Sequence, residues 1–237
     1  MRAMSSELQQ YMTGLTNEIS RGHFDEAARL GEKALEMEEL HSEGNEPLLG
    51  EVYRNMAAAS DRLGQTDAAL NYIDQAYDIH DTAVNENSGV ETLRERSATA
   101  SYVGVFALEA YLLAEGRDEA LADKARLMTR QAELDMAKVS QLSEEENADQ
   151  YEINMASRWS MIESLVGDKQ RGLALAGRAI RLAWQSERDQ QKGLTGRDVL
   201  RARTRAALRG MAAVAVNAAS RFGATRSMAE KIALKTL

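Results

Sequence analysis

The sequence predicts an all-α fold, and three observations support that prediction. There is one proline in 237 residues, so long helices can run without interruption. Residues with high helix propensity, such as alanine, leucine, glutamate, arginine and methionine, are abundant, whereas strand-forming residues are sparse. Amphipathic stretches that are separated by a glycine and a short polar link recur along the chain.

Five antiparallel pairs of helices are expected from the positions of these breaks. The pairs are 6–21 with 24–40, 48–63 with 66–82, 91–115 with 118–139, 143–166 with 169–188, and 197–222 with 225–235. Pro47 stands where the third helix begins, and the fixed φ of proline favours a helix start. Ser143 and Glu146 resemble a capping box at the start of the seventh helix.

A glycine is expected to end the first helix of each pair. Gly22, Gly64, Gly116 and Gly167 occupy this place, and Gly223 marks a weaker fifth copy. A left-handed conformation at a helix end costs glycine little, because it has no Cβ. Small residues follow these glycines and allow close helix packing, so together the copies predict stacked helical hairpins.

The first two copies resemble the tetratricopeptide repeat (TPR), a helix–turn–helix unit of about 34 residues. The residues that carry the resemblance are 53–64 (YRNMAAASDRLG), Ala69, Ile73 and Ala76 in one copy, and Gly22, Phe24, Ala27 and Ala34 in the other. Later copies are looser, and the turn glycines are further apart than in the standard repeat. The resemblance covers about residues 6–188. It implies a right-handed superhelical stack of about five antiparallel helical hairpins, a TPR-like α-solenoid.

We expect one TPR-like helical repeat domain over residues 1–237, in which 190–237 form a basic C-terminal hairpin or cap. The charge is unevenly distributed along it. Residues 1–167 carry 14 Lys and Arg against 32 Asp and Glu, a net charge of −18, and residues 168–237 carry 15 against 5, a net charge of +10. Such a difference indicates a basic contact surface, or two regions that attract each other.

By resemblance, the first helices of the hairpins line a concave groove that binds a peptide or a partner helix. In many TPR proteins an asparagine nine residues before the turn glycine hydrogen-bonds the ligand backbone, and Asn55 occupies that place. An amide side chain both donates and accepts. The expected partner-binding residues are Arg54, Asn55, Arg62, Asn154 and Arg158. The alternative is that Asn55 and Arg158 are solvated or locally bonded surface residues.

A basic stripe is expected in the C-terminal region, because Arg201, Arg205 and Arg209 recur every four residues on one helical face. Such a stripe could neutralise the phosphates of a nucleic acid. Almost no aromatic residue interleaves with it for base stacking, however. It could instead be a solvated face, or pair with the acidic region of the same chain or of a second copy.

Catalytic and metal-binding motifs are not evident in the sequence. The absence of cysteine excludes disulfides, thiolate zinc sites and a cysteine nucleophile. There is no glycine-rich phosphate loop, nucleophile elbow or paired-histidine metal spacing. His80 and Asp81 have no nucleophile near them in sequence, and adjacent helical residues point in different directions. We therefore expect a protein that is not an enzyme and has no metal or cofactor. An unrecognised enzyme stays the weakest alternative, because catalytic sites assemble across a fold.

The function that the sequence favours is a non-enzymatic protein- or peptide-binding module, an adaptor, scaffold or peptide-responsive regulator. One alternative is a self-assembling structural protein, a homo-oligomer joined by acidic N-terminal and basic C-terminal surfaces. A second is nucleic-acid binding through the basic stripe, which ranks below a protein partner. The sequence has neither the apolar core of a signal peptide nor a stretch of ~20 apolar residues. We therefore expect a cytoplasmic protein without membrane contact.

Overall fold

The computed structural model describes residues 5–114, 118–142, 150–190, 211–218 and 230–232, without the side chains of 150–154 and 183–190. Every regular element within these ranges is helical, so the all-α prediction is confirmed there. Up to residue 190 the elements are α1 (Ser6–Arg21), α2 (Phe24–Leu35), the 3-10 turn η1 (Glu38–His41), α3 (Glu46–Arg62), α4 (Thr66–Ala83), α5 (Val90–Leu113), α6 (Glu119–Leu142), α7 (Gln150–Val166) and α8 (Lys169–Gln190).

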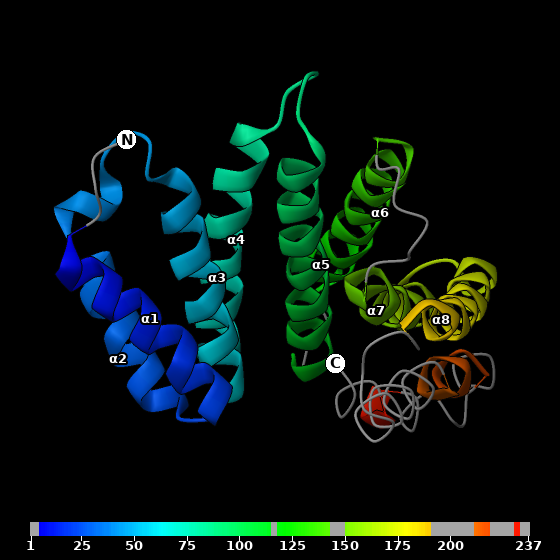
Figure 1. The fold of residues 1–237 in the computed structure, drawn as a ribbon. Helices are drawn as coiled ribbons and strands as arrows, with labels where there is room; N and C mark the ends of the chain where they lie inside the picture. The colour runs from blue at the N-terminus through cyan, green and yellow to red at the C-terminus, as the bar shows by residue number, and fades with distance from the viewer. Residues whose placement is uncertain (1–4, 115–117, 143–149, 191–210, 219–229, 233–237) are drawn as a thin grey trace.

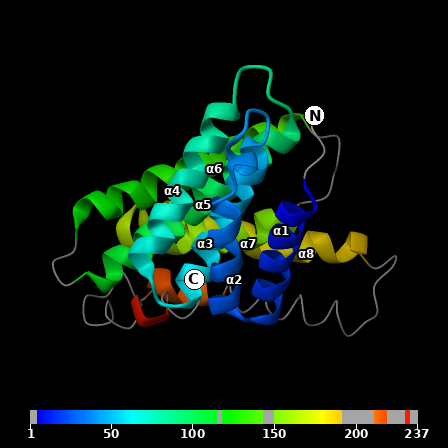
Figure 2. The same cartoon turned by 90° about the vertical axis from the view of Figure 1, so that its left-hand side faces the viewer.

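Helices that are neighbours along the chain are also neighbours in space. Contact is most extensive within the pairs α5/α6, α3/α4 and α7/α8, and α1 packs on α2 about as extensively as α4 packs on α5. The second helix of each of the first three pairs also contacts the next pair. Figure 1 shows the helices following one another from α1 and α2 on one side to α7 and α8 on the other. Seen from the α1–α2 side, α7 and α8 lie behind the other helices (Figure 2). This packing of adjacent pairs is compatible with a helical repeat.

Local signals in the sequence explain several helix ends. Ser5 caps α1, and its side chain accepts a hydrogen bond from the backbone N–H of Leu8 at 3.3 Å. Gly22 follows α1 with a φ of 80°, and Gly64 follows α3 with a φ of 73°. Both angles lie in the left-handed region, as the sequence predicted for these two turns.

Gly167, between α7 and α8, is required for a different reason. Its φ is not positive, so the left-handed conformation predicted for it is wrong. A Cβ at this position would lie 2.1 Å from Oε2 of Glu163. That carboxylate is fully buried and accepts the backbone N–H of Asp168 at 2.8 Å. The missing side chain therefore makes room for a buried carboxylate that holds the turn between the helices.

Alanine residues allow the helices to approach closely. Ala27 and Ala34 in α2 and Ala76 in α4 are fully buried, and Ala69 in α4 is 1% exposed. These are the small residues that carry the repeat pattern, and their burial confirms that they pack between helices. Trp159 in α7 fills a larger volume of the core.

A buried ion pair fixes the positions of α4, α5 and α6. Asp135 in α6 is fully buried and accepts hydrogen bonds from Nε and an Nη of Arg96 in α5, at 2.8 and 2.7 Å. The same guanidinium donates to Asp81 in α4 at 2.7 Å. Such bidentate geometry offsets part of the cost of removing both charges from water.

The structure differs from the predicted boundaries at α2, which ends at Leu35 instead of 40. Met37 takes an extended conformation, and η1 then turns the fully buried Leu40 into the core. The predicted helix start at 143, with Ser143 and Glu146, lies outside the described residues. So does most of the pair 197–222 with 225–235, of which 211–218 and 230–232 are described and helical.

Candidate functional site

A groove of about 880 Å³ lies where the ends of α3, α4 and α5 meet. Pro47 stands in the first turn of α3, and the chain leaves the helical conformation between Ala83 and Val90. These two features bring three helix ends together. Contact between α3 and α5 is less extensive than between α1 and α3 or between α5 and α7. Side chains of all three helices therefore line the space.

The groove combines apolar and acidic side chains. Its apolar residues are Pro47, Leu48, Ile79 and Ala83. Its ionisable residues are Glu46, Glu51, Arg54, Asp78, His80, Glu91 and Glu95. Five carboxylates therefore face one arginine, which gives the lining a net charge of −4 when the histidine is neutral.

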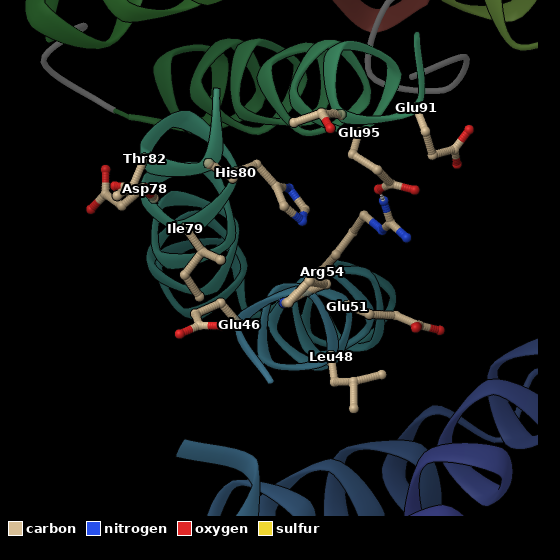
Figure 3. A pocket seen from close by; sticks show the side chains of 13 residues that line it. Glu46, Leu48, Glu51, Arg54, Asp78, Ile79, His80, Thr82, Glu91 and Glu95 are labelled. Atoms are coloured by element: carbon tan, nitrogen blue, oxygen red, sulfur yellow. Dashed lines mark hydrogen bonds and ion pairs between the residues drawn. The ribbon is translucent and has the colours of Figure 1, made fainter. Parts of the chain in front are cut away.

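Five ionisable side chains gather on one side of α4, in the space between α3 and α5 (Figure 3). We call them the polar cluster, and its members are Glu51, Arg54, His80, Glu91 and Glu95. Asp78 and Thr82 point to the other side of α4 and away from the cluster. The cluster therefore draws its residues from three different helices.

An ion pair crosses the polar cluster from α3 to α5. The guanidinium of Arg54 donates to Oε2 of Glu95, and both side chains are partly exposed. The carboxylates of Glu51 and Glu91 make no hydrogen bond or ion pair with any residue that the structure describes. One cation is therefore already engaged, and two carboxylates in the cluster remain available.

His80 is the buried member of the polar cluster, with 7% of its surface exposed. Its Nδ1 lies 2.7 Å from the hydroxyl oxygen of Thr99. That hydroxyl donates its own proton to the carbonyl oxygen of Glu95 at 2.9 Å, so it must accept from the histidine. The neutral ring therefore carries its proton on Nδ1 and a lone pair on Nε2.

The surroundings of His80 favour the neutral form of its ring. Burial lowers its pKa, and the positive charge of Arg54 lowers it further, against a smaller opposing effect of Glu95. The ring fits between α3 and α4 because residue 50 is glycine, where a Cβ would lie 2.6 Å from Nε2. Among the described residues no donor reaches Nε2, which lines the groove.

Three of the five predicted partner-binding residues lie on neighbouring surfaces. Asn55 lines a smaller hollow of about 130 Å³ together with Arg54, Tyr102 and other residues of α3, α4 and α5. Arg158 in α7 lies over the ring of Tyr102, with its Cζ 5.3 Å from the ring centroid. Arg54 lines both the hollow and the larger groove, so it joins the two.

The other predicted residues lie elsewhere. Arg62 lines neither space and is exposed beside Asp61, with 3.8 Å between its Nε and Oδ2 of the aspartate. Asn154 belongs to α7, but its side chain lies outside the described part. The basic stripe of Arg201, Arg205 and Arg209 also lies outside it.

Sequence reasoning missed His80 and the glutamates of the polar cluster as site residues. Glu91 and Glu95 stand four apart at the start of α5 and share one face of that helix, which is a signal that the sequence carries. Nothing in the sequence, however, places that face opposite Arg54 and Glu51. The histidine looked like a residue at a helix end, and its hydrogen bond to Thr99 depends on how α4 packs on α5.

No protein-family model matches the chain, and no curated protein matches it. Among the described residues, no three His, Cys, Asp or Glu side chains are arranged to hold a metal ion. None of the described helices combines the length and the apolar composition that crossing a membrane requires.

Proposed function

We propose that this protein is a non-enzymatic protein- or peptide-binding module and that its ligand binds in the groove between α3, α4 and α5. The observation that supports the proposal is the groove itself, about 880 Å³ in volume, with apolar and charged side chains from three helices. Binding sites commonly have volumes of ~300–1,000 Å³ and combine apolar walls with a few placed polar groups.

The neighbouring hollow extends the proposed surface along α3 and α5. Asn55 lines it, and its amide can donate to and accept from a peptide backbone. Tyr102 and Phe106 supply aromatic surface beside the amide, with 6.1 Å between their ring centroids. In this proposal the described hairpins belong to a TPR-like superhelical stack, and an extended or helical segment follows its first helices.

The proposal can be tested by selection of peptides from a random display library on the immobilised full-length protein. Affinities of enriched peptides are then measured by fluorescence anisotropy. The Ala83→Trp variant places an indole at an exposed position of the groove lining. We expect it to weaken binding about tenfold or more, because the indole occupies ligand space.

The matched control is Ala137→Trp, which adds the same side chain at an exposed position of α6 outside the groove. We expect it to leave the affinities unchanged. If no peptide is enriched, or if enriched peptides bind the Ala83→Trp variant as tightly as the wild type, the groove is not the binding site. An Asn55→Ala variant with full affinity would remove Asn55 alone.

A further inference from the structure

We propose that the ligand of this groove is a basic peptide segment of a partner protein, and that one of its arginine or lysine side chains binds in the polar cluster. This inference rests on the proposed function and adds the chemical class of the ligand. Glu51 and Glu91 would pair with basic side chains of the segment, while His80 Nε2 would accept an N–H group from it. The apolar residues of the groove would contact the rest of the segment.

The free carboxylates supply the first argument. Glu51 and Glu91 lie on opposite walls of the cluster and make no ion pair with a described residue. The lining as a whole carries five carboxylates against one arginine. Complementary charge favours the encounter with a cationic segment and disfavours an acidic one.

The buried histidine supplies the second argument, which does not depend on the carboxylates. His80 is 7% exposed as a residue, but its Nε2 is not fully buried, so a ligand that covers this atom must supply a hydrogen bond in place of water. Its Nδ1 is satisfied by Thr99, whereas Nε2 lines the groove with a lone pair and no described donor. A ligand that satisfies Nε2 must supply a donor, and guanidinium and ammonium groups have donors only.

The third argument comes from Arg54, which shows that the cluster accommodates a guanidinium group. Its side chain crosses from α3 and binds the carboxylate of Glu95 (Figure 3). Arg54 thus holds one carboxylate that a cationic ligand would otherwise use, and its charge opposes that ligand. We infer that Arg54 competes with the ligand for Glu95 and lowers its affinity.

The composition of the selected peptides is the first test. Peptides that lose affinity for the Ala83→Trp variant should be enriched in arginine and lysine, and replacement of one such residue by glutamine should weaken binding about tenfold. Groove-dependent peptides that are neutral or acidic would overturn this inference and leave the proposed function intact. The absence of groove-dependent peptides would instead contradict the proposed function.

Charge variants of the protein are the second test, because their effects should have opposite signs. We expect Glu51→Gln and Glu91→Gln each to weaken binding of a selected basic peptide about threefold to fivefold, and Arg54→Gln to strengthen it by a similar factor. The control is Glu119→Gln, an exposed position of α6 outside the groove, which should change nothing. Weaker binding by the Arg54 variant as well would show damage to the groove and would overturn the inference.

A basic segment of the chain itself is another candidate occupant, which the same assay distinguishes. A synthetic peptide of residues 197–211 carries five arginines and one aspartate. One outcome is that this peptide binds as tightly as the selected peptides while the full chain self-associates over the same concentration range. That result would identify the occupant as a second copy of the chain and would overturn the proposal of a separate partner protein. We expect the 197–211 peptide to bind at least tenfold more weakly than the selected peptides, because the selected peptides match the shape of the groove as well as its charge.

Discussion

Glu109 and Asp61 form a pair of carboxyl groups that makes stability depend on pH. Asp61 lies in the last turn of α3, Glu109 lies in the last turn of α5, and the two side chains are hydrogen-bonded to each other. Burial, followed by this hydrogen bond and the negative charge of Asp61, raises the pKa of Glu109 from 4.5 to about 7. The folded protein therefore holds a proton that the unfolded chain releases.

The direction of the pH dependence follows from the two pKa values. The stabilisation is complete below about pH 4.5 and is lost as the pH rises through about 7. The full shift corresponds to about 3 kcal/mol at ~1.4 kcal/mol per unit. Because Glu109 is partly exposed, solvent screening reduces the expected effect to about 1–2 kcal/mol.

The Glu109→Gln variant tests this reasoning, since an amide keeps a donor for Asp61 but cannot ionise. At pH 8 we expect its free energy of unfolding, measured by urea denaturation and circular dichroism, to exceed that of the wild type by about 1–2 kcal/mol. At pH 4.5 the two proteins should be equally stable. Glu32→Gln, at an exposed position of α2, is the control. Equal stabilities at pH 8 would refute the raised pKa of Glu109.

Three further predictions concern stability and are measured by urea denaturation at neutral pH. Asp135→Ala removes the buried partner of Arg96 and should lower the free energy of unfolding by about 3–5 kcal/mol, and a loss below ~1 kcal/mol would show that the pair is not structural. Gly167→Ala brings a Cβ to 2.1 Å from Glu163 Oε2 and should cost about 1–3 kcal/mol. Gly177→Ala, in α8, places a Cβ with nothing within 4 Å and should instead raise the free energy of unfolding by about 0.5–1 kcal/mol. A less stable variant would contradict the finding that this position has room for a side chain.

The helices were predictable from the sequence because their signals are local. A helix end requires a cap or a glycine within a few residues, and Ser5, Gly22 and Gly64 act as such signals where they stand. The pattern of alanines likewise indicated which faces pack. At Gly167 the local signal wrongly predicted a left-handed φ. A glycine is required there because a Cβ would collide with the carboxylate of Glu163.

The candidate site was predictable only in part. Arg54 and Asn55 were identified because a repeat pattern assigns them to the first helix of a hairpin, and they do line the spaces beside α5. That the guanidinium of Arg54 is already bound to Glu95 could not be predicted. The two residues are 41 positions apart, and their contact depends on the separation between α3 and α5.

The sequence by itself determined the helical class, most helix boundaries and the small residues between helices, because periodicity, capping and residue size act over short distances. The tertiary structure alone decided where the acidic groove lies. It also decided that burial and Arg54 lower the pKa of His80 beside that groove, and that burial and Asp61 raise the pKa of Glu109. The physical reason is that charge, burial and hydrogen bonding at these residues come from other helices, whose positions depend on the packing of the whole chain.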